Sequence, residues 1–124
     1  GDIPVKSIYS MTEAESEVME KLWDQEESIK QSHLLTLFEE DGKEWKRQTL
    51  NTFLSRLEEK GFVIRERRMV KAVYSREEYH LMRMKEEIDR IYNGKLGNFV
   101  AAFTKENGID RKEAKELIEL LEKY

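Results

Sequence analysis

The sequence predicts a mainly α-helical fold that contains one small β-hairpin. Apolar residues recur at helical spacing in several segments, most clearly at Leu50, Phe53, Leu54 and Leu57. Residues 62–75 instead alternate apolar with polar side chains, which is typical of two short strands. The 124 residues are enough for one compact domain with a smaller appendage.

The distribution of charge along the chain is uneven. Charged residues make up 39% of the sequence, and the net charge is −4. Residues 42–76 nevertheless contain ten Lys or Arg against four Asp or Glu, a local balance of +6, whereas the remainder of the chain carries −10. A basic segment within an acidic protein is typical of a surface that binds a polyanion, and chance clustering of charge is the alternative.

Several classes of function are disfavoured by what the sequence lacks. It has no cysteine, which excludes disulfides, thiolate metal sites and cysteine nucleophiles and fits a reducing cytoplasm. No apolar run approaches the ~20 residues of a membrane span, and the N-terminus lacks the apolar region of a signal peptide. His33 and His80 have no partner at metal-ligand spacing, and no phosphate-binding or catalytic motif is present. We therefore expect a cytoplasmic protein with no membrane insertion, metal, cofactor or enzymatic activity.

Two helices are expected before the basic segment. Residues 1–10 show no helical period and include the only proline, so we expect an extended arm there. A capping box at residues 12–15 opens a helix that should end near Asp24. Residues 28–29 form a short extended piece, and the second helix follows over residues 30–40.

The third helix, expected over residues 46–60, carries the most informative side chains. The face opposite its apolar stripe bears short or planar hydrogen-bonding groups, namely Gln48, Thr52 and Ser55 flanked by Asn51 and Arg56. These residue types bind base edges and phosphates. Lys46 and Arg47 lie at the positive end of the helix dipole, where cations are unfavourable unless an anion such as phosphate is bound. An ordinary solvated face is the alternative.

The predicted hairpin is also basic. Its two strands should turn near residues 67–69, although no glycine or asparagine supports that turn. Arg65, Arg67, Arg68 and Lys71 crowd the hairpin, which favours a nucleic-acid contact over a solvated edge protected by charge. Two helices followed by a basic helix and a basic hairpin is the order of a winged helix-turn-helix, in which the third helix enters the major groove of DNA.

Three short amphipathic helices are expected after the hairpin. A capping box opens the first at Ser75, and Asp110 caps the last. Because three short helices cannot bury their own apolar stripes well, we expect them to pair with a second copy of the chain as a twofold dimer. The candidate dimerisation residues are Leu81, Ile88, Leu96, Phe99, Phe103, Leu117, Ile118 and Leu121.

Three stretches carry a family resemblance: MTEAESEVMEKLW at residues 11–23, TLNTFLSRLEEKGFV at 49–63 and KLGNFVAAFTKENGI at 95–109. They resemble the penicillinase-repressor family of bacterial transcriptional regulators (BlaI/MecI/CopY). The resemblance implies a dimeric winged-helix repressor of a DNA operator. It also implies control of β-lactam resistance genes and inactivation by proteolysis once a membrane sensor protease is activated.

The resemblance also assigns roles to residues. It places Thr49, Thr52 and Arg56 at positions typical of the family's recognition helix, and Gln48 and Asn51 at variable positions that would set sequence preference. It aligns the family's cleavage site with Ala102 and Phe103, where alanine stands in place of the usual asparagine.

Two further departures from the family pattern concern the helix cap and the metal. Lys46 occupies the position of the usual Ser or Thr cap of the recognition helix. The C-terminal cysteine cluster of the copper-responsive members is absent, which argues against copper sensing through thiolates.

We thus predict an arm at residues 1–10, a winged-helix DNA-binding domain at 11–76 and a helical dimerisation domain at 77–124. The partners expected are a double-stranded DNA operator, a second copy of the chain and a membrane sensor protease. A winged-helix module that contacts an acidic protein, without sequence-specific DNA binding, is the alternative. The candidate DNA-binding residues are Lys46, Arg47, Gln48, Thr49, Asn51, Thr52, Arg56, Arg65, Arg67, Arg68 and Lys71.

Overall fold

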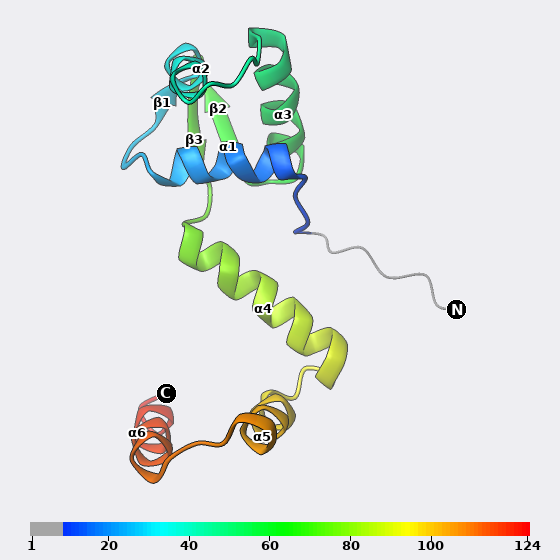
Figure 1. Cartoon of the computed structure of the whole chain (residues 1–124), viewed down its shortest axis with the longest axis vertical. Helices are drawn as coiled ribbons and strands as arrows, with labels where there is room; N and C mark the ends of the chain where they lie inside the picture. Colours follow the sequence, from blue (N-terminus) through cyan, green and yellow to red (C-terminus); the bar gives the residue numbers. More distant parts are fainter. Residues whose placement is uncertain (1–8) are drawn as a thin grey trace, which may run out of the picture. The chain divides into compact units, whose positions relative to one another are not determined.

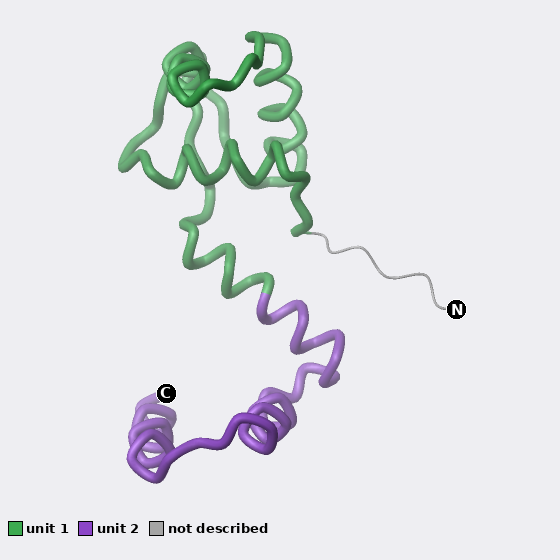
Figure 2. The backbone as a smooth tube through the Cα atoms, in the orientation of Figure 1, with its two compact units in different colours: residues 1–83 green, residues 84–124 purple. Residues whose placement is uncertain are grey.

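The computed structural model describes residues 9–124, and residues 1–8 of the expected arm lie outside the described residues. Its helices and strands follow the expected order, which confirms a mainly helical fold with a small β-hairpin (Figure 1). The chain forms two compact units, residues 1–83 and residues 84–124 (Figure 2).

The first unit contains three helices, three strands and the start of a fourth helix. Their bounds are α1 (Glu13–Trp23), β1 (Ile29–Lys30), α2 (Gln31–Glu40), α3 (Arg47–Glu59), β2 (Val63–Glu66), β3 (Met69–Ala72) and α4 (Arg76–Tyr92). The Tyr79 hydroxyl donates to the carbonyl oxygen of Tyr9 at 3.1 Å, so the beginning of α4 belongs to this unit. The functional division expected between residues 76 and 77 stays a prediction.

The start of α1 is fixed by the expected capping box. The backbone N–H of Glu15 donates to the hydroxyl oxygen of Thr12, and the backbone N–H of Thr12 donates to a carboxylate oxygen of Glu15, both at 3.1 Å. The Glu15 carboxylate is fully buried and also accepts from the Lys60 ammonium at 2.8 and 2.9 Å. This ion pair joins the start of α1 to the end of α3.

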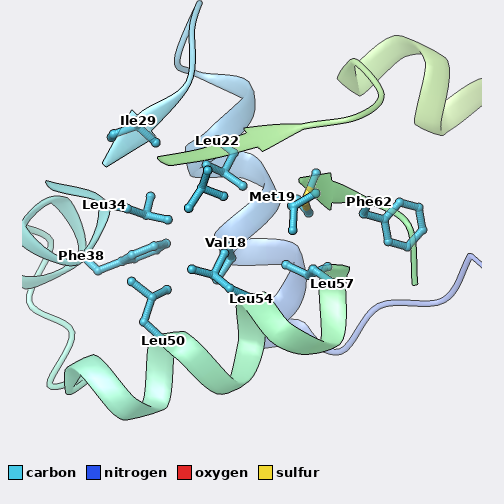
Figure 3. Packing of buried hydrophobic residues seen from close by; sticks show 12 residues of the cluster. Val18, Met19, Leu22, Ile29, Leu34, Phe38, Leu50, Leu54, Leu57 and Phe62 are labelled. Atoms are coloured by element: carbon cyan, nitrogen blue, oxygen red, sulfur yellow. The ribbon is translucent and has the colours of Figure 1, made fainter. Parts of the chain in front are cut away.

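The hydrophobic core lies between α1, α2, α3 and the sheet. Figure 3 shows side chains from α1, β1, α2 and α3 meeting there. Leu50, Leu54 and Leu57 of the expected α3 stripe are buried, and each contributes about 1.5–3 kcal/mol by leaving water. Phe53, the fourth member of that stripe, is only partly buried, because it packs at the edge of the core against Trp45, with ring centroids 5.0 Å apart.

The sheet has three antiparallel strands in the order β1-β3-β2. The hairpin of β2 and β3 was expected, whereas the pairing of Ile29 in β1 with Val70 in β3 was not. Arg67 and Arg68 form the two-residue turn with φ angles of +51° and +67°. Both central residues of this turn therefore adopt the left-handed conformation that glycine or asparagine usually supplies.

The second unit contains the rest of α4 together with α5 (Leu96–Asn107) and α6 (Arg111–Leu121). Asn93 and Gly94 end α4 with positive φ angles, and Gly108 does the same for α5. The backbone N–H of Glu113 donates to the Asp110 carboxylate at 2.7 Å, which confirms the predicted cap of α6. Within residues 76–121, all of which the structure describes, no residue is buried.

Candidate nucleic-acid interface

The outer face of α3 presents the hydrogen-bonding side chains that the sequence predicts. Gln48, Asn51, Thr52, Ser55 and Arg56 are exposed, because the opposite side of the helix faces the core. The Thr52 hydroxyl donates to the backbone carbonyl of Gln48 at 3.1 Å, so its oxygen remains able to accept a hydrogen bond. Thr49 is half-buried at the edge of this face.

The N-termini of α2 and α3 lack the usual caps. Lys30 and Lys46 occupy the cap positions, and no described side chain caps either helix. Neither first turn contains an acidic residue, whereas α1 and α6 have both a side-chain cap and acidic residues in their first turns. The uncapped first turns and the helix dipoles of α2 and α3 therefore favour an anion.

A hollow of about 940 Å³ connects the two helix starts with the tip of the hairpin. Four cations line it, and no acidic residue is among the described residues that do so. It is lined by Lys30, Gln31, Ser32, Leu35, Arg47, Gln48, Leu50, Asn51, Arg67 and Arg68. The Gln31 backbone N–H donates to the Arg68 carbonyl oxygen at 2.9 Å, which holds the turn of the hairpin against the start of α2. Cations, helix N-termini and exposed polar side chains thus share one surface.

The structure separates the candidate cations of the hairpin into three positions. Arg67 and Arg68 are exposed at the turn beside the hollow. Lys71 pairs with Ile64 and is exposed on the other face of the sheet from Arg65, because successive strand residues point to opposite faces. Arg65 lies against α3, where Glu58 accepts from its guanidinium at 3.2 Å, and this hydrogen bond holds the pKa of the Glu58 carboxyl below its usual value.

The hollow beside Arg47 is also lined by three residues that were not predicted from the sequence, namely Lys30, Gln31 and Ser32. A signal for them was present, because Lys30 starts its helix in the same way as Lys46: a basic residue at the cap position and no acidic residue in the first turn. Lys95 starts α5 in the same way, so this pattern marks Lys30 only together with its place beside Arg47 in the hollow.

Neither a metal site nor a membrane-spanning helix is found among the described residues. In residues 9–124, no cluster of three or more His, Asp or Glu side chains is placed to hold a metal ion. None of the helices in the described part of the chain combines the length and hydropathy needed to cross a bilayer.

A recognition-type helix with an exposed polar face, set beside a basic hairpin, defines the winged helix-turn-helix class of DNA-binding proteins. The chain belongs to the penicillinase repressor family, whose sequence model matches residues 11–123. The family consists of DNA-binding transcriptional repressors rather than enzymes, which confirms the family and the class of function expected from the sequence. No curated protein matches the chain closely enough to identify a relative.

Proposed function

We propose that the chain is a dimeric repressor that binds a palindromic operator, with α3 in the major groove and the hairpin against the DNA backbone. The observation that carries this proposal is the hollow that places Arg47, Arg67 and Arg68 beside the outer face of α3. Cations at the uncapped starts of α2 and α3 can bind phosphates, while Gln48, Asn51 and Arg56 are free of the core to contact base edges.

Duplex binding measured at several salt concentrations tests this proposal. A chain that binds DNA through cations should lose affinity as salt rises, and base contacts should make it prefer some sequences over others. We expect Arg56→Ala and Gln48→Ala to reduce the preference for selected duplexes over random ones. If the chain binds no duplex at low salt, the basic surface instead serves an acidic protein partner.

Homodimerisation is supported by the apolar side chains that α4, α5 and α6 expose. Leu81, Phe103, Ile118 and Leu121 are each more than half exposed in the single chain, while Ile88, Phe99 and Leu117 are half-buried. Large apolar side chains exposed in this way are typical of protein–protein interfaces. A second copy of the chain fits the proposed operator, because a twofold dimer presents two recognition helices to two half-sites.

Release from the operator by proteolysis is the third part of the proposal. Ala102 and Phe103 lie within α5, so the bond between them is helical. Proteases bind extended substrates, and cleavage would therefore require local opening of α5. A cut at this bond would separate α6 from the DNA-binding unit and remove Ile118 and Leu121 from the dimer. In such a scheme a membrane sensor protease would deliver the signal, β-lactam resistance genes would be the regulated genes, and the repressor itself would act in the cytoplasm.

A further inference from the structure

The side chain of Arg65 connects the hairpin to α3. Its Nη1 donates to Oδ1 of Asn51 at 2.9 Å, and its Nη2 donates to the Ser55 hydroxyl at 2.9 Å and to the Glu58 carboxylate at 3.2 Å. Asn51, Ser55 and Glu58 follow one another at helical spacing along a single side of α3. Arg65 is only 20% exposed, so it is largely occupied within the protein.

This contact fixes which way the Asn51 amide faces. A guanidinium has donors only, so the amide group that meets it must be the oxygen. The NH₂ group of Asn51, which carries two donors, is then left for other partners on the exposed side of α3. Ser55 and Glu58 hold the guanidinium in place without help from Asn51, so the orientation of the amide is imposed from the hairpin.

The direction of the amide decides which bases it can recognise. Asparagine usually recognises adenine with both its oxygen and its nitrogen, since adenine presents a donor next to an acceptor in the major groove. One lone pair of the Asn51 oxygen accepts from Arg65, which turns the oxygen toward the hairpin and competes with this contact to adenine. A donating group suits bases that present acceptors in the major groove: guanine presents two, O6 and N7, thymine and adenine present one each, and cytosine presents only a donor.

We infer that Arg65 is a positioning residue that turns the donor group of Asn51 toward the bases and so makes Asn51 a specificity determinant for guanine and against cytosine. This inference rests on the proposed function, in which α3 occupies the major groove. In this role Arg65 binds side chains of α3 and does not contact a phosphate. It also makes the hairpin part of base recognition without any contact between Arg65 and the bases.

Selection of duplexes from a random pool, followed by sequencing, tests the inference. The full chain should select guanine over cytosine at one position in each half-site, and Asn51→Ala should lose the preference at that position alone. Arg65→Met frees the Asn51 oxygen, so the ratio of affinities should shift toward adenine at the same position by about five-fold or more. Glu58→Gln weakens the anchor of Arg65 and should produce a smaller shift in the same direction.

Arg67→Met is the matched control. It makes the same Arg-to-Met change in the same hairpin, but at a residue that borders the hollow. It should weaken binding to all duplexes and leave the base preference unchanged. Thermal unfolding followed by circular dichroism verifies that each variant folds. If Asn51→Ala alters no position, or if folded Arg65→Met and Glu58→Gln both keep the original preference, the inference is overturned while the proposed function stands. If the unmodified chain selects no sequence at all, the proposed function itself fails.

Discussion

The proposed function predicts how DNA binding depends on salt, through the cations that line the hollow. Lys30, Arg47, Arg67 and Arg68 contribute four cations in each protomer, and hence eight in the proposed dimer. If each neutralises one phosphate, the logarithm of the binding constant should fall with the logarithm of salt concentration with a slope of about −7. Between 50 and 200 mM salt, the affinity would then decrease by about ten-thousand-fold.

Arg67→Gln removes one of these cations from each protomer without touching the face of α3. The slope should become shallower by about 1.8, and the loss of affinity over the same salt range should fall to about a thousand-fold. Fluorescence anisotropy of a labelled duplex measures both quantities. Arg111→Gln, at the exposed start of α6, is the control with the same loss of charge and should keep the original slope. An unchanged slope for Arg67→Gln would show that the hairpin tip does not contact phosphate.

Three further predictions concern assembly, release and stability. Ile118→Asp should give monomers in sedimentation experiments and abolish operator binding, because it places an unpaired charge in the proposed interface; a dimeric variant would contradict this. A chain ending at Ala102 should likewise dimerise and bind DNA less tightly, and equal binding would exclude cleavage there as the switch. Burial disfavours the charged form of Glu15, yet hydrogen bonds from Lys60 and Thr12 outweigh it and lower the pKa of its carboxyl. A lowered pKa in the folded state means that the ion pair stabilises the fold above the ordinary pKa of about 4.3 and that this stability is lost as the pH falls below it. Glu15→Gln should cost about 1–3 kcal/mol at neutral pH and less in acid, as thermal unfolding would show.

Local signals were sufficient to predict the helices. Capping boxes at Thr12 and Ser75 and the glycine ends Gly61 and Gly94 act within one turn of the chain, so they are visible in the sequence. The pairing of β1 with β3 joins residues about forty positions apart, and two residues are too few to show a strand pattern. The pairing was not predicted because these hydrogen bonds join residues that are far apart in the sequence.

The candidate site was predicted in its composition but not in its internal contacts. A count of cations treats Arg65, Arg67, Arg68 and Lys71 alike, whereas the fold assigns them different surroundings. Arg65 forms hydrogen bonds with side chains of α3, and these side chains meet only after the hairpin packs on that helix. Lys30 was missed for the same reason, since its position beside Arg47 depends on how α2 and α3 pack together.

The turn at Arg67 and Arg68 has a consequence for the evolution of stability in this protein. Each arginine adopts a left-handed backbone conformation, which costs about 1–2 kcal/mol for residues other than glycine. Glycine at Arg68 would relieve this strain and raise the melting temperature, but it would also remove a cation from the hollow. Selection for thermal stability alone should therefore drive this turn toward glycine, and selection for repression should restore arginine. If the hollow binds DNA as proposed, the hairpin tip is a position at which a more stable fold and tighter operator binding require opposite substitutions.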